Sequence, residues 1–141
     1  MCRVLVIDDE EDVLNAVKRR LERAGHTVET AQGAAEGIEK ISGAETPYDA
    51  IITDMSMDQK EAGLQVLHAA FARDLFAAVI VMTAYGNVAN AVESMRRGAF
   101  DYIEKNTPDV DVFEHLAAKL DEALDRRRRD ARTIEMWDRS R

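Results

Sequence analysis

Short apolar runs alternate with amphipathic segments along this chain. The apolar runs are typical of buried strands and occupy residues 3–7, 26–31, 48–55, 77–86 and 100–105. Between them, apolar residues recur at helical spacing at residues 11–25, 34–42, 63–75 and 87–99, and again from Phe113 onward. Five strands interleaved with five helices predict an α/β fold with a doubly wound parallel sheet that helices cover on both faces.

The first predicted helix illustrates how a buried face is assigned from spacing. We expect Val13, Val17, Leu21 and Ala24 to share the inner face, and Gly25 to end the helix. Acidic residues 10–12 precede this apolar face, where they favour the positive end of the helix dipole.

The last predicted helix continues beyond the part that a core requires. Its inner positions are Phe113, Leu116, Leu120 and Leu124, followed by the weaker Arg127, Ala131 and Ile134. We therefore predict a core domain at residues 1–124 and a basic helical extension at 125–141. A frayed tail is the alternative, and pairing of the extension with a second copy as a short coiled coil is a hypothesis.

Charge is distributed unevenly along the 141 residues. The net charge is −8, but residues 1–125 carry −12 and residues 126–141 carry +4. The body is therefore not expected to bind nucleic acid. The basic run at 126–129 is interpreted as a solvated helix face in preference to a nucleic-acid contact. With one cysteine and no membrane-spanning apolar run, we expect a cytoplasmic protein.

Polar residues that could bind a ligand or take part in a reaction fall at the ends of the predicted strands. Asp8 and Asp9 end the first strand, Asp54 the third, Thr83 the fourth and Lys105 the fifth. In open parallel sheets, ligands bind beyond the carboxyl ends of the strands. Three carboxylates converging there need a cation, and oxygen ligands favour Mg²⁺ or a similar ion. A carboxylate beside such a metal can act as a nucleophile toward phosphorus.

These residues and the segments around them resemble the receiver domain of two-component response regulators, over residues 3–124. The matching segments are VLVIDDE, IITDM, VIVMTAYG and GAFDYIEK. The stretch from Thr83 to Lys105 is most similar to receivers of sigma-54-dependent activators. The resemblance implies a flavodoxin-like sheet with strand order 2-1-3-4-5.

The resemblance also implies roles for the acidic residues. Asp54 would be the phosphoacceptor, receiving its phosphoryl group from a histidine kinase or a phosphotransfer protein. Asp8 and Asp9 would hold Mg²⁺ or Mn²⁺ together with Asp54 and the backbone carbonyl of Ser56.

A second set of residues would read the phosphoryl group. By resemblance, Thr83 would donate a hydrogen bond to it, Lys105 would pair with it, and Ala84 is suitably small beside it. Tyr102 matches the aromatic residue that turns inward on activation, although an aromatic side chain at a strand position is also often plain core. A face made by the fourth helix, fifth strand and fifth helix would then change its partners or form a homodimer.

Two positions depart from the family pattern. Asn106 follows Lys105 where the family usually has a proline joined by a cis peptide, so we expect either a trans bond or a strained one. After Asp54, the family commonly has a proline four residues on and a glycine eight residues on. Here Asp58 and, at nine, Gly63 take these places, which predicts a longer loop.

Other functions remain as alternatives. A degenerate receiver would keep the fold and dock partners without being phosphorylated. A Mg²⁺-dependent phosphatase of the haloacid dehalogenase type would need two aspartates spaced by one residue on the first strand, which the sequence DDE lacks. We expect a phosphorylated switch rather than a turnover enzyme, either as a stand-alone receiver or as part of a longer regulator.

Overall fold

The sheet is parallel throughout and has the strand order β2-β1-β3-β4-β5. The computed structural model describes residues 2–57, 59–84, 88–106 and 108–140. Its strands are β1 (Arg3–Ile7), β2 (Thr27–Ala31), β3 (Ala50–Asp54), β4 (Ala78–Thr83) and β5 (Asp101–Glu104). Its helices are α1 (Glu11–Arg23), α2 (Ala34–Gly43), α3 (Ala62–Arg73), α4 (Val88–Arg96) and α5 (Val112–Arg139). The predicted fold class and strand order are confirmed; residues 85–87, expected to join the fourth strand to the fourth helix, lie outside the described ranges.

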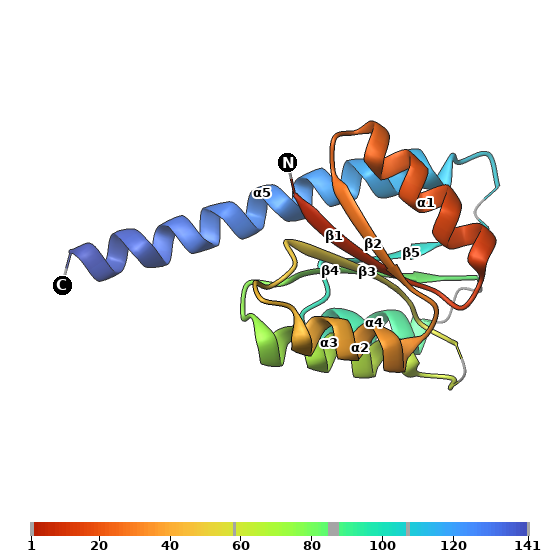
Figure 1. Cartoon of the computed structure of the whole chain (residues 1–141), viewed down its shortest axis with the longest axis horizontal. Coiled ribbons are helices and arrows are strands. Elements are labelled where there is room, and N and C mark those ends of the chain that lie inside the picture. The colour runs from red at the N-terminus through yellow and green to blue at the C-terminus, as the bar shows by residue number, and fades with distance from the viewer. Residues whose placement is uncertain (1, 58, 85–87, 107, 141) are drawn as a thin grey trace.

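Helices cover the two faces of the sheet in unequal numbers. Helices α1 and α5 lie on one face, and α2, α3 and α4 lie on the other (Figure 1). Alternate strand residues supply the two cores. Val4, Val6 and Ile80 face α1 and α5, whereas Leu5 and Ile7 face the opposite helices. Because both faces are covered, the central strands β3 and β4 are fully buried and mostly apolar, with polar residues confined to their carboxyl ends.

Helix α1 buries a slightly different face from the one predicted. Leu14, Val17 and Leu21 are buried and Val13 is partly buried, whereas Ala24 is exposed as the C-cap residue. The buried stripe therefore keeps the predicted Val13 at its margin, adds Leu14, and ends before the cap. Gly25 has φ +95°, a left-handed conformation that lets the chain leave the helix.

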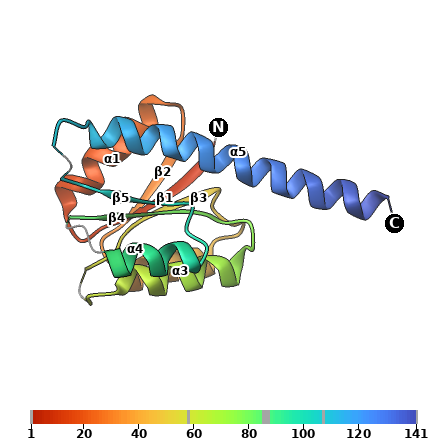
Figure 2. The same ribbon diagram turned by 180° about the vertical axis from the view of Figure 1, so that it is seen from behind.

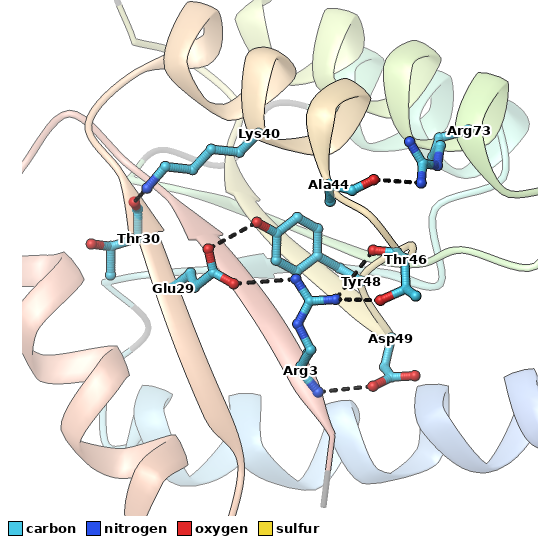
Figure 3. Close-up of polar contacts among 9 residues, drawn as sticks. All are labelled: Arg3, Glu29, Thr30, Lys40, Ala44, Thr46, Tyr48, Asp49 and Arg73. Carbon is cyan, nitrogen blue, oxygen red and sulfur yellow. Dashed lines mark hydrogen bonds and ion pairs between the residues drawn. The ribbon is translucent and has the colours of Figure 1, made fainter.

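A polar cluster connects the start of β1 and the segment before β3 with the middle of β2. The Arg3 guanidinium lies over the Tyr48 ring, 4.6 Å from its centroid, and forms an ion pair with Glu29 at 3.3 Å (Figure 3). The Tyr48 hydroxyl donates a hydrogen bond to Glu29 at 3.0 Å, and the Arg3 backbone N–H donates to Asp49 at 2.8 Å. This cluster lies at the edge of the sheet opposite to the strand ends that carry the candidate site.

The long helix α5 extends past the sheet (Figure 2). Its basic run is not simply a solvated face, because two arginines contact the domain. Arg127 pairs with Asp74 at 2.5 Å and lies 3.8 Å from Asp49, while Arg126 lies over the Phe100 ring at 4.8 Å. Among the described residues, no helix is both long and apolar enough to cross a membrane.

Strand register brings the candidate residues to one edge. Ile7 of β1 pairs with Thr53 of β3, so the next residues along each strand, Asp8 and Asp54, are neighbours. On the other side of β3, the register continues through β4, where Thr83 pairs with Glu104 of β5. Lys105 follows directly, so the carboxyl edge of the sheet gathers the residues that the sequence placed at strand ends.

Candidate functional site

Three consecutive acids at the end of β1 form a cluster. Asp8, Asp9 and Glu10 each offer a carboxylate oxygen, and these atoms lie within 4.8 Å of one another. Asp8 is 2% exposed, and its Oδ1 accepts a hydrogen bond from the Glu10 backbone N–H at 2.9 Å. That bond folds the chain tightly between β1 and α1. Glu11 and Asp12 occupy the first turn of α1 as expected, but the Glu10 side chain joins the cluster, a placement the sequence analysis missed.

Asp54 is the buried carboxylate of the site. It ends β3 and is 6% exposed. Burial, followed by the negative charge of Asp8, raises the pKa of Asp54 to about 6, although Lys105 opposes that rise. The negative charge of Asp54 is therefore only partly balanced by Lys105 in the folded protein, and a bound cation would stabilise it.

Lys105 provides the internal positive charge. Its Nζ lies 2.5 Å from Asp8 Oδ2 and 3.4 Å from Asp54 Oδ2. Burial alone would lower the pKa of Lys105, but the hydrogen bond to Asp8 and the charges of Asp54 and Asp8 outweigh it, so the pKa is raised. The ammonium therefore stays charged and lies within reach of both carboxylates.

The donor set suits a hard divalent cation. Asp8, Asp9 and Glu10 offer carboxylate oxygens, and buried Asp54 lies on the neighbouring strand. One ammonium faces this larger number of carboxylates. Oxygen donors of this kind fit Mg²⁺ or Mn²⁺, which accept carboxylates and retain waters for further ligands. The residues at this edge therefore match the predicted magnesium site in chemistry.

The end of β4 is tied to the end of β5 by two hydrogen bonds. Thr83 is 6% exposed, and its carbonyl accepts from the Lys105 backbone N–H at 2.7 Å. The carbonyl of half-buried Ala84 accepts from Asn106 Nδ2 at 3.0 Å. No described peptide bond is cis, so the bond between Lys105 and Asn106 is trans, one of the two expected outcomes.

The loop after Asp54 is held by contacts of its own. Ser56 Oγ donates to the Lys60 carbonyl at 2.6 Å, and the Gly63 backbone N–H donates to the Met55 carbonyl at 2.8 Å. A Cβ on Gly63 would lie 2.8 Å from the Asp54 carbonyl oxygen and 2.8 Å from Met55 Cα. Glycine is therefore required where α3 begins. Asp58, the substituted family position, lies outside the described residues.

Tyr102 lies on β5, partly buried against the core beneath α2, α3 and α4. Its hydroxyl is buried, and in the described part of the chain it has no hydrogen-bond partner. A buried phenol hydroxyl without a hydrogen bond costs free energy, which a move of the side chain to a position with a partner would recover. The switch role of Tyr102 and the metal-binding role of the Ser56 carbonyl stay predictions.

Comparison with known proteins gives consistent matches. The family model described as the response regulator receiver domain matches residues 4–117. The chain is 34% identical over 122 residues to the acid tolerance regulatory protein ActR of Rhizobium meliloti (strain 1021), covering 86% of this chain and 61% of ActR. The chain thus spans less than two thirds of the length of this curated relative.

Solved structures agree with this match. NtrX from Brucella abortus has a TM-score of 0.84 at 26% identity, covering 99% of this chain and 30% of NtrX. The beryllofluoride-activated NtrC4 receiver domain dimer has a TM-score of 0.76 at 29% identity, covering 90% of this chain and 99% of that one. These two likenesses agree with the expected similarity to receivers of sigma-54-dependent activators.

Proposed function

This chain belongs to the response regulator receiver domain family, and on that premise we propose that Asp54 accepts a phosphoryl group from a histidine kinase or a phosphotransfer protein. Receiver domains of this family act in two-component phosphorelay signalling. The observation that carries the assignment to Asp54 is its position: a buried carboxylate at a strand end, with the Lys105 ammonium 3.4 Å away and Asp8 on the next strand.

Phosphoryl transfer requires a nucleophile and compensation for the charge of the incoming group. The donor carries the phosphoryl group on a ring nitrogen of a histidine. An Asp54 carboxylate oxygen forms a new bond to phosphorus while the bond between phosphorus and that nitrogen breaks, which returns the donor histidine to its free imidazole form. The Lys105 ammonium pairs with the phosphoryl oxygens, and the Thr83 hydroxyl donates a hydrogen bond to them. Because Lys105 already contacts both Asp8 and Asp54, it needs only a short displacement to do so.

Magnesium completes the proposed chemistry. Asp8, Asp9 and Asp54, with the Ser56 carbonyl, would hold Mg²⁺ or Mn²⁺. When bound, the ion neutralises the excess negative charge and orients phosphoryl oxygens. Glu10 lies in the same carboxylate cluster and adds negative charge that favours cation binding.

A change of partner on phosphorylation follows from the same proposal. Helix α4 exposes Val88, Val92 and Met95 at helical spacing, beside β5 with its half-buried Tyr102. Pairing of this face, or of the projecting part of α5, with a second copy is the proposed homodimer. The NtrC4 receiver domain, a structural relative, is described as a dimer. The proposal also locates the chain in the cytoplasm, where kinase and Mg²⁺ are available.

Intact mass spectrometry tests the assignment. We expect one phosphoryl adduct after incubation with acetyl phosphate and Mg²⁺, and none without the metal or with Asp54→Asn. A folded protein that forms no adduct would favour the docking-module alternative. Release of phosphate from an added phosphate monoester over many turnovers would favour the phosphatase alternative.

A further inference from the structure

The strand ends beside the proposed phosphorylation site are joined by an unusual side-chain contact. Beyond the last register pair of β4 and β5, the Lys105 backbone N–H donates to the Thr83 carbonyl at 2.7 Å. The next carbonyl, that of Ala84, accepts from the Asn106 side chain at 3.0 Å. The carbonyls of the last residue of β4 and of the residue after it are thus held by two consecutive residues after β5.

The Asn106 side chain can donate the hydrogen bond that the Ala84 carbonyl needs. Among the described residues, this is its one side-chain hydrogen bond. A carbonyl oxygen can only accept, so the amide must present its NH₂ group to Ala84. Asparagine in a loop usually bonds to its own neighbouring backbone, whereas here it reaches a residue 22 positions earlier in the chain. The peptide before it is trans, which leaves the side chain to make the connection.

We propose that Asn106 is a positioning residue that restrains Thr83 in the unphosphorylated protein. This inference rests on the proposed function, in which the Thr83 hydroxyl must reach a phosphoryl group on Asp54. The backbone around Thr83 is fixed at its own carbonyl by Lys105 and at the following carbonyl by Asn106. Movement of Thr83 toward Asp54 carries Ala84 with it and lengthens the bond to Asn106.

The expected effect has the size of one exposed hydrogen bond. Removing the bond lowers the cost of moving Thr83, so small-molecule phosphorylation becomes faster by about threefold. Asn106→Ala removes the donor, and Asn106→Leu removes it while keeping the shape of the side chain. Asn106→Gln keeps an amide donor on a longer side chain. Asn15→Ala, at an exposed position of α1, is the matched control.

The experiment compares rate constants for adduct formation from acetyl phosphate at saturating Mg²⁺, with the melting temperature of each variant. The Ala and Leu variants are expected to react about threefold faster than wild type, with Gln and the control near wild type. Equal or slower rates for Ala and Leu, in a wild type that is phosphorylated, would overturn this inference alone. A wild type that takes no phosphoryl group would overturn the proposed function and this inference together.

Discussion

The Lys105 ammonium lies 2.5 Å from Asp8 Oδ2 and links the end of β5 to the end of β1, across the two strands between them. Both side chains are largely buried, at 10% and 3% exposure. The contact places the positive charge of the site among several carboxylates. In the metal-free protein, removal of this lysine should therefore lower the stability, whereas removal of one of the carboxylates should raise it.

Lys105→Met should destabilise the metal-free protein. The substitution keeps an unbranched side chain but leaves Asp8 and Asp54 without their cation, and we expect the free energy of unfolding to fall by about 3 kcal/mol. Urea denaturation with a chelator present measures the change. Lys119→Met is the matched control, because the pairs of Lys119 with Asp101 and Glu122 are more exposed and such pairs contribute up to about 1 kcal/mol. Equal losses in the two variants would contradict the account.

Asp54→Asn should stabilise the metal-free protein at neutral pH. The unfolded chain releases the Asp54 proton near its ordinary pKa of 3.8, whereas the folded protein holds that proton until about pH 6. Stability is therefore lost as pH rises between these values, and the full loss is present above them. We expect Asn to recover about 2 kcal/mol near neutral pH, a value reduced from the full shift because water partly screens the site.

The same variant gives a clear pH test. In acid, below the ordinary pKa of an aspartate, Asp54 is protonated in both states and Asn should offer no advantage. Unfolding free energies of the two proteins, measured across this range without Mg²⁺, should converge as pH falls. A stabilisation that is independent of pH, or a destabilisation at neutral pH, would show that Asp54 is not the strained carboxylate.

Gly63→Ala should disturb the site through the backbone. Its Cβ would lie 2.8 Å from both the Asp54 carbonyl oxygen and Met55 Cα, so β3 or α3 must shift. We expect a loss of about 2 kcal/mol in unfolding free energy and slower adduct formation at Asp54. Gly43→Ala is the control, since no atom lies within 4 Å of its added Cβ. A Gly63→Ala protein that matches wild type in both measurements would argue against this close packing.

Arg127→Ala should weaken the contact between α5 and the rest of the domain. Arg127 pairs with Asp74 at 2.5 Å, and both side chains are mostly buried. Losing this charge-assisted contact is expected to cost about 2 kcal/mol in urea denaturation. Arg129→Ala changes a neighbouring exposed arginine and should alter stability by less than about 0.5 kcal/mol. If the two variants behave alike, the predicted boundary after residue 124 would describe the domain better.

Residues fixed by strand periodicity could be predicted from the sequence. Asp8, Asp54, Thr83 and Lys105 stand at the ends of the predicted strands, and parallel pairing collects such ends at one edge. The helical phase of α1 was less certain, because Leu14 and Val13 are adjacent apolar residues and only packing decides between them.

Contacts between segments far apart in the chain could not be predicted in this way. The hydrogen bond from Asn106 to Ala84 and the pairing of Arg127 with Asp74 depend on how loops meet after the helices have packed. No local spacing marks either one. The place of Glu10 in the carboxylate cluster could have been predicted, because Glu10 directly follows Asp8 and Asp9. The sequence analysis instead assigned Glu10 to the start of α1, where it would favour the helix dipole.

Localising the phosphoryl group tests the central proposal most directly. Borohydride reduces an acyl phosphate, so a phosphorylated aspartate becomes homoserine, and peptide mass spectrometry identifies its position. After reaction with acetyl phosphate and Mg²⁺, the account predicts this conversion at Asp54 alone. Conversion at Asp8 or Asp9, or none in a protein whose intact mass shows the adduct, would contradict the assignment of Asp54 as the phosphoacceptor.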